Sequence, residues 1–132
     1  MRVYLAAPLF SDEEREYNKR IADSIRSADF TVILPQEFDG NEESIYKQCL
    51  DTISHGTDVI VSLLNGADAE SGTSFECGYG RAMGKTIIGI RTDMRGNHVD
   101  GLNIMLRFGI DYLVGSVEEA IDFLKQIHSI NI

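Results

Sequence analysis

The feature that most constrains the fold of this 132-residue chain is the alternation of short apolar runs with longer amphipathic segments. The run at residues 58–64 is the most continuous, which is typical of a central strand in a parallel sheet. In all, five strands are predicted, at residues 3–7, 30–34, 58–64, 86–90 and 112–114. Strands that alternate with helices predict an α/β fold with a five-stranded parallel sheet between two helical layers. No linker or repeat interrupts residues 1–132, so we expect one domain.

Two sequence signals mark the starts of helices. Ser11-x-x-Glu14 and Ser116-x-x-Glu119 both match the capping box. The predicted helices cover residues 11–28, 44–54, 73–83 and 102–108, followed by a closing helix from residue 116. Three glycines in and after the third helix are predicted to let it pack closely on the sheet: Gly78, Gly80 and Gly84.

The composition limits the partners. Twelve Lys and Arg against 21 Asp and Glu give a net charge of −9. Because phosphate contacts dominate nucleic-acid affinity, we expect no binding to nucleic acid polymers, and anionic membranes should repel the chain. No apolar run approaches the roughly 18 residues of a membrane span. The chain is expected to be cytoplasmic, with Cys49 and Cys77 as reduced thiols.

The sequence also carries no signal for a metal or a cofactor. The histidines and cysteines lack the spacing of a zinc site. The loop after the first strand, residues 6–11, lacks the glycines that a dinucleotide requires, and no phosphate-binding loop for nucleoside triphosphates is present. We therefore expect no metal and no cofactor.

Chemistry-bearing residues concentrate at residues 65–79, N-G-A-D-A-E-S-G-T-S-F-E-C-G-Y, after the predicted central strand. Ligands of parallel sheets bind beyond the carboxyl ends of the strands. This segment holds three carboxylates, Asp68, Glu70 and Glu76. Glu76 is predicted in the first turn of a helix, where the helix dipole favours its ionised form. An ionised carboxylate beside an apolar wall can attack a sugar carbon while a second acid assists the leaving group.

A structural interpretation of the same residues stands beside this one. Thr73-x-x-Glu76 is itself a capping box, which would explain Glu76 without any chemistry. Asp68 and Glu70 could equally be solvated loop charges.

A longer stretch of this region, A-D-A-E-S-G-T-S-F-E-C-G-Y-G-R-A-M-G-K-T-I-I-G-I-R-T-D-M-R, resembles the signature of the nucleoside 2-deoxyribosyltransferase family. The opening V-Y-L-A-A-P-L-F and the later G-L-N-I-M-L resemble it too, in the right order over most of the chain. The resemblance implies a flavodoxin-like sandwich. It also implies transfer of 2-deoxyribose between bases through a glycosyl-enzyme ester, with 2′-deoxynucleosides and free bases as small-molecule partners.

By that resemblance Glu76 is the nucleophile and Tyr4 hydrogen-bonds and orients it. Taken alone, Tyr4 could be an ordinary strand aromatic. Glu70 stands where family members often carry Asp and would bind the sugar hydroxyls, with Gly72 and Asp68 also at the substrate.

The resemblance also places residues around the base. Leu9 and Phe10 match positions that pack on it, with Ala7 in the same loop, although Phe10 could instead be a hydrophobic staple on the first helix. Asn103 and Met105 match residues that family members donate from a neighbouring subunit, against the alternative of a short surface helix. The match implies a homodimer or higher homo-oligomer with shared active sites.

A second position, on the predicted second helix, also departs from the family pattern. Some members protonate the base with an Asp on the second helix, and Cys49 stands at the corresponding place here. Asp51 lies two residues on, which is about 200° around a helix, so we expect it to face away from the site. Protonation would then fall to another acid, such as Asp68, or to water.

Other functions are open at this stage. An N-glycoside hydrolase of the same superfamily would act on deoxynucleoside 5′-monophosphates, with water resolving the ester. Its phosphate would need a cationic clamp, for which Arg91, Arg95 and Arg107 are candidates, unless they form salt bridges within an acidic chain. A non-catalytic nucleoside-binding module would have Glu76 salt-bridged away from the pocket. A plain scaffold for protein partners would have no deep pocket near Glu76.

Overall fold

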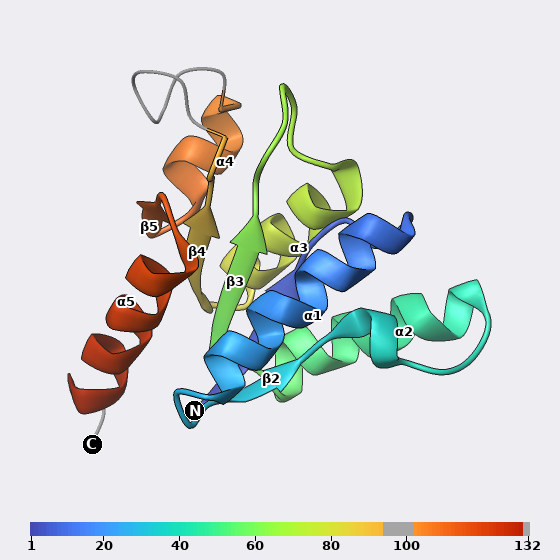
Figure 1. Ribbon diagram of the computed structural model, residues 1–132. Coiled ribbons are helices and arrows are strands. Elements are labelled where there is room, and N and C mark those ends of the chain that lie inside the picture. The colour runs from blue at the N-terminus through green and yellow to red at the C-terminus, as the bar shows by residue number, and fades with distance from the viewer. Residues whose placement is uncertain (94–101, 131–132) are drawn as a thin grey trace.

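The computed structural model of the protein describes residues 1–93 and 102–130 (Figure 1). Its five strands form one fully parallel sheet with the order β2-β1-β3-β4-β5, so β3 is central as predicted. The strands are β1 (Arg2–Ala6), β2 (Thr31–Ile33), β3 (Val59–Leu63), β4 (Thr86–Ile90) and β5 (Tyr112–Val114). This order is that of flavodoxin-like sheets, and the predicted fold class is confirmed. Each predicted strand end lies within one residue of the observed end.

Helices cover both faces of the sheet. Two helices, α1 (Asp12–Arg26) and α5 (Val117–Ile130), pack on one face. The other face carries α2 (Glu42–His55), α3 (Ser71–Ala82) and α4 (Ile104–Gly109), and a short 3₁₀ turn, η1 (Pro35–Glu37), precedes α2. Figure 1 shows the sheet lying between these two layers.

The alternation of side chains along the strands divides the core into two clusters. In β1, Val3 and Leu5 pack toward α1 and α5, whereas Tyr4 and Ala6 pack toward α2, α3 and α4. All four side chains are fully buried. Tyr4 therefore lies on the same face of the sheet as α3, the helix that carries Glu76.

The capping signals are confirmed in part. Ser11 Oγ accepts a hydrogen bond from the Glu14 N–H at 3.1 Å, and the Glu14 carboxylate accepts one from the Ser11 N–H at 2.8 Å. At α5, Ser116 Oγ accepts a bond from the Glu119 N–H, but the Glu119 carboxylate accepts from the N–H of Gly115. The second box is therefore only half formed.

The three glycines have different roles. A Cβ on Gly80 would lie 2.1 Å from Ile60 Cδ1, so this glycine does allow α3 to approach the sheet closely. The same prediction is wrong for Gly78, which has open space around a Cβ position. It is also wrong for Gly84, whose positive φ of 75° allows the chain to turn after α3.

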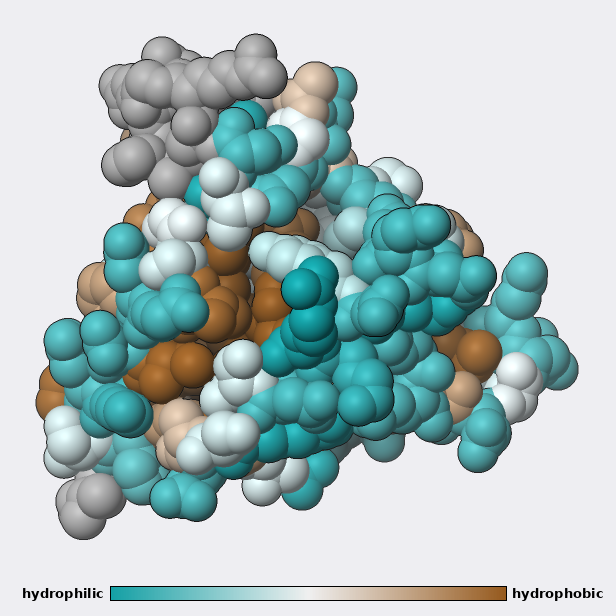
Figure 2. Space-filling view, in the orientation of Figure 1, coloured by the Kyte–Doolittle hydropathy of each residue, from teal (hydrophilic) through white to brown (hydrophobic). Residues whose placement is uncertain are grey.

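Figure 2 shows the face of the molecule that α1 and α5 cover. Apolar surface gathers in the groove between these two helices, and hydrophilic side chains surround it. None of the helices in the described part of the chain is long and apolar enough to cross a bilayer. The elements that carry Glu76 and Cys49 cover the opposite face of the sheet.

Candidate active site

The candidate site is built around α3, which begins at Ser71, two residues before the predicted start. Its N-cap is Glu70, whose carboxylate accepts hydrogen bonds from the N–H groups of Gly72 at 2.8 Å and Thr73 at 2.7 Å. Glu76 thus lies in the second turn, and Thr73 and Glu76 do not form the capping box that their spacing indicates. The purely structural explanation of Glu76 is therefore wrong.

Glu76 meets Tyr4 from the neighbouring strand. The Tyr4 hydroxyl donates a hydrogen bond to Glu76 Oε2. Tyr4 is fully buried in the middle of β1, so its ring is held by the core and its hydroxyl position is fixed. The structure therefore brings together the two residues to which the family resemblance gives catalytic roles.

The surroundings of Glu76 favour its protonated form more than a helix N-terminus would. Burial is the main cause that raises the pKa of Glu76 to about 7, and the negative charge of Glu70 raises it further. The hydrogen bond from Tyr4 opposes both effects. The expectation that the helix dipole keeps Glu76 ionised is wrong, because its second-turn position lies beyond the free N–H groups.

Tyr4 stays a hydrogen-bond donor. Burial, followed by the negative charge of Glu76, raises the pKa of Tyr4 well above its usual value. The phenol therefore keeps its proton near neutral pH and donates its hydrogen bond to Glu76 as a neutral group.

A cavity of about 480 Å³ opens in front of Glu76, between α2, α3 and the loop after β1. We call it the Glu76 cavity. Part of its lining comes from Glu76, Cys49, Ser71 and Gly72. Apolar side chains make most of its walls: Leu9, Pro35, Ile45, Tyr46, Leu50 and Phe75. A carboxylate at the edge of an apolar hollow of this size suits a flat, weakly polar ligand such as a nucleobase with its sugar.

The three residues predicted to bind substrate from the first loop lie in different surroundings. Leu9 lines the Glu76 cavity. Ala7 instead packs in the core on the α1 and α5 face, so its side chain does not reach the cavity. Phe10 is 72% exposed, which excludes a staple packed against α1 and leaves its ring in solvent in this single chain.

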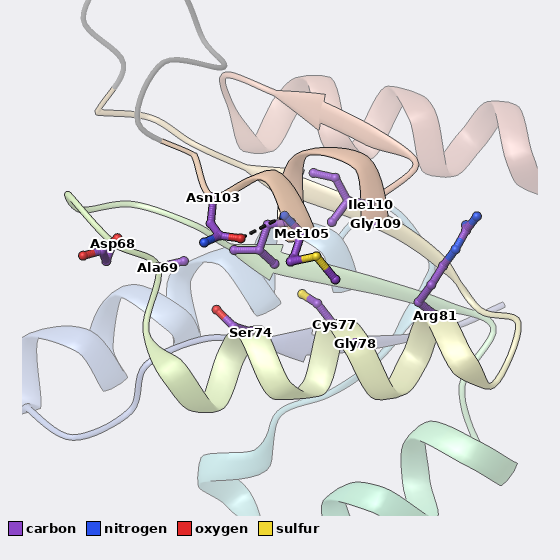
Figure 3. A pocket seen from close by; sticks show the side chains of 11 residues that line it. Asp68, Ala69, Ser74, Cys77, Gly78, Arg81, Asn103, Met105, Gly109 and Ile110 are labelled. Carbon is purple, nitrogen blue, oxygen red and sulfur yellow. Dashed lines mark hydrogen bonds between the residues drawn. The ribbon is translucent and has the colours of Figure 1, made fainter.

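Three other predicted residues surround a different cavity, of about 490 Å³, between α3 and α4 (Figure 3). Asp68, Asn103 and Met105 line it, together with Ser74 and Arg81 among others. The Asn103 side chain accepts a hydrogen bond from the Met105 N–H at 2.8 Å and so caps α4. Within one chain the structure therefore does not bring Asp68, Asn103 or Met105 to the Glu76 cavity.

Cys49 and Asp51 lie on different sides of α2. Cys49 lines the Glu76 cavity, and burial raises the pKa of its thiol, which stays protonated at neutral pH. Asp51 is exposed and pairs with His55 at 3.1 Å, so it faces away from the cavity as its helical position predicts. Asp68 does not line the Glu76 cavity either, because it lines the cavity between α3 and α4.

Of the apolar walls, only Leu9 was predicted from the sequence. On α2, Ile45 and Cys49 are four residues apart and form one row. Tyr46 and Leu50 form the adjacent row at the same spacing, and this row was the available signal for a second wall. Phe75 gave no such signal, because its neighbours in sequence are polar.

Two of the candidate phosphate partners, Arg91 and Arg107, do not line the Glu76 cavity. Arg91 is buried, where it donates to the Leu64 carbonyl oxygen at 3.4 Å and lies 3.9 Å from Asp93. Arg107 is exposed, with its guanidinium 5.3 Å from the centre of the Phe108 ring. Arg95 lies outside the described residues. No cluster of three His, Cys, Asp or Glu side chains that could hold a metal ion occurs within residues 1–93 and 102–130.

Comparison with known proteins decides the family. The sequence model of the nucleoside 2-deoxyribosyltransferase family matches residues 3–111. The chain belongs to this family. A search of curated proteins finds no match.

Solved structures of similar fold include both transferases and a glycosidase. A 2-deoxyribosyltransferase from Leishmania mexicana has a TM-score of 0.80 and 23% identity, covering 96% of this chain and 98% of its own. One from Bacillus psychrosaccharolyticus has a TM-score of 0.76 and 19% identity, covering 92% and 90%. A CMP N-glycosidase from Clostridium botulinum has a TM-score of 0.65 and 20% identity, covering 95% and 99%. The nucleoside 2-deoxyribosyltransferase fold is thus used for transfer and for hydrolysis.

Proposed function

We propose that this protein is a nucleoside 2-deoxyribosyltransferase that exchanges the base of 2′-deoxynucleosides through a covalent ester on Glu76. The observation that carries the proposal is the half-buried Glu76 carboxylate, which Tyr4 holds at the edge of an apolar cavity in a member of this family. A free base accepts the deoxyribose. The proposed small-molecule partners are therefore 2′-deoxynucleosides and free bases.

The first half-reaction forms the ester. Tyr4 holds Oε2, so Oε1 is the oxygen that attacks C1′ of the deoxyribose. The C1′–Oε1 bond forms while the C1′–N bond breaks, and the electron pair of the broken bond leaves with the base, which takes up a proton from water or an acid of the site. In the second half-reaction a nitrogen of another base attacks C1′, the C1′–Oε1 bond breaks as the C1′–N bond forms, and the incoming base gives its N–H proton to water or to an acid of the site, so that the Glu76 carboxylate is released unchanged.

The two non-catalytic alternatives lose support. The binding-module hypothesis expects Glu76 to be salt-bridged away from the pocket, yet Glu76 lines a cavity, and within the described residues it has no salt-bridge partner. The scaffold hypothesis expects no deep pocket near Glu76, yet the cavity measures about 480 Å³.

Hydrolysis is the second candidate. The similarity to the CMP N-glycosidase from Clostridium botulinum favours it, because that protein has the same fold over 95% of this chain. Water would then attack C1′ of the ester in place of a second base. The two activities share Glu76, Tyr4 and the first half-reaction.

We also propose that a neighbouring copy completes each site. On α4, Met105 is 77% exposed, and its neighbours Ile104 and Phe108 are also mostly exposed. An apolar surface of this kind is typical of contacts between subunits. Asn103 and Met105 would then reach the Glu76 cavity of the partner, which explains why they do not reach their own.

The test is a chromatographic assay of deoxyinosine or thymidine with free adenine. Formation of deoxyadenosine that is lost in Glu76→Ala supports the transferase. Free deoxyribose without an exchange product would support the hydrolase instead. Mass spectrometry of the protein quenched in acid should show one deoxyribosyl group on the wild type and none on Glu76→Ala. Equal activity in the two proteins would contradict the assignment of the nucleophile.

A further inference from the structure

The chain that leaves β3 stays beside the chain that leaves β4. Within the sheet the two strands pair in one register, with Leu63 opposite Ile90 at the end of the ladder. The same register continues for three residues beyond the strands, through hydrogen bonds that involve side chains. We call these contacts the exit pairs: Leu64 with Arg91, Asn65 with Thr92, and Gly66 with Asp93.

Two of the exit pairs have good hydrogen-bond geometry although their residues are exposed. Asn65 Oδ1 accepts a hydrogen bond from the Thr92 N–H at 2.7 Å, and Asn65 Nδ2 donates one to Thr92 Oγ1 at 2.8 Å. The Asp93 carboxylate accepts a hydrogen bond from the Gly66 N–H at 2.6 Å, and bonds of this charged kind are stronger than neutral ones. Side chains therefore hold the two loops together where strand pairing has ended.

The exit pairs end where the chain turns toward α3. Gly66 has a φ of 103°, a left-handed conformation that glycine adopts without strain. Only residues 67–69 then separate Gly66 from Glu70, the N-cap of α3 (Figure 1). A segment of this length spans at most about 10 Å when fully extended. The position of Gly66 therefore limits where α3 can begin.

The first turn of α3 depends on the exit pairs more than Glu76 does. Glu76 is in the second turn and is bonded to Tyr4 from β1, which holds it independently of the loop. Ser71 and Gly72 come before that contact, and both line the Glu76 cavity. The exit pairs thus fix one wall of the cavity, whereas Tyr4 fixes the carboxylate.

We propose that Asn65, Thr92 and Asp93 are positioning residues that set the first turn of α3 and thereby the shape of the Glu76 cavity. None of the three lines that cavity, so they act through α3. The effect on substrate binding rests on the proposed function, but the effect on α3 does not. Loss of an exit pair should weaken substrate binding more than it slows the chemical step, because Tyr4 still holds Glu76.

Hydrogen exchange read by mass spectrometry tests the inference without turnover. Asn65→Ala removes both bonds of its pair, and Asp93→Ala removes the bond from Gly66. Asp93→Asn keeps an acceptor for that bond and should behave as the wild type. The matched control is Asp58→Ala, because the Asp58 carboxylate accepts a bond from the Arg2 N–H at 2.7 Å at the opposite end of the sheet.

We expect the backbone amides of residues 72–75 to exchange about tenfold faster in Asn65→Ala and Asp93→Ala, with those of residues 78–82 unchanged. Asp58→Ala should leave the amides of residues 72–75 at the wild-type rate. In the base-exchange assay both Ala variants at the exit pairs should raise KM about tenfold and keep kcat within about threefold of the wild type. Asp93→Asn should keep the wild-type KM, which a role of the negative charge itself would not allow.

Unchanged amides at residues 72–75 in both variants, or equal acceleration in Asp58→Ala, would overturn the inference. A fall in kcat with an unchanged KM would overturn it too. A wild type that performs no base exchange would refute the proposed function alone, because the hydrogen-exchange comparison judges the exit pairs without any substrate.

Discussion

At the scale of single residues, the raised pKa of Glu76 should set the pH range of the proposed activity. As the proposed nucleophile Glu76 must be ionised to react, and burial raises its pKa to about 7. We therefore expect kcat/KM to rise with pH through about 7 and to fall about tenfold for each pH unit below that value. Initial rates from pH 5 to 9 at low substrate concentration would measure this limb. A profile that is flat between pH 5 and 8 would contradict the environment described for Glu76.

Tyr4 provides an independent test of the same carboxylate. Tyr4→Phe removes the hydroxyl that bonds Glu76 and that lowers its pKa. The acidic limb of the pH profile should move to higher pH, and kcat/KM at pH 7 should fall by about 10- to 100-fold. A merely structural role for Tyr4 would lower the melting temperature and leave the position of the limb unchanged.

Because Glu76 is largely buried, its ionised form destabilises the folded protein. Its folded pKa exceeds the unfolded value, so the folded chain binds more protons and loses stability as the pH rises from about 4 to 7. Glu76→Gln should therefore be more stable than the wild type by about 2 kcal/mol at pH 8, and the difference should shrink toward pH 5. Urea denaturation at both pH values measures it. A variant less stable than the wild type at pH 8 would contradict the prediction that ionised Glu76 destabilises the folded protein.

At the scale of elements, α3 offers a matched pair of glycines. Gly80→Ala forces Ile60 and its fully buried neighbours to repack, because the new Cβ would lie 2.1 Å from Ile60 Cδ1. We expect a loss of about 1–3 kcal/mol in the free energy of unfolding. Gly78→Ala in the same helix meets open space and should gain about 0.5–1 kcal/mol from helix propensity. Chemical denaturation of both variants tests the contrast, and equal effects would contradict it.

The start of α3 shows why the local geometry of the site was harder to predict than its residues. Ser, Thr, Asp and Asn are the usual N-caps, so Thr73 with Glu76 was the expected box. Glu70 takes the cap because its carboxylate reaches the N–H groups of both Gly72 and Thr73. This shift of the N-cap from Thr73 to Glu70 moves Glu76 to the second turn and reverses the expected direction of its pKa. Local preferences alone could not decide between the two caps.

At the scale of the whole molecule, periodicity was enough to predict the sheet. The run at residues 58–64 has no polar face, and β3 is indeed buried along its whole length. The alternation in β1 then fixes Tyr4 on the α3 face. The division of the remaining predicted residues between two cavities could not be predicted, because it depends on how α4 packs against α3. That packing joins segments separated by residues 94–101, which lie outside the described residues.

The expected sharing of sites between copies has its own test. Glu76→Ala and Asn103→Ala proteins should each be inactive, but a mixture that has been allowed to exchange subunits should regain activity. One site in each mixed dimer would combine an intact Glu76 with an intact Asn103 from the partner. Sedimentation should show at least a dimer for the wild type. A monomer, or a mixture that stays inactive, would contradict site sharing.

The hydrogen bond between Tyr4 and Glu76 also has a consequence for how the protein is made. It joins residues 72 positions apart, and they come from the first strand and from the helix after the central strand. During synthesis the tyrosine leaves the ribosome long before its carboxylate partner exists, and β1 cannot pair with β3 until α1, β2 and α2 have also been made. Folds that depend on contacts of such long sequence separation form slowly. The pair of Tyr4 and Glu76 can therefore come together only after β3 and α3 have been made and have packed beside β1.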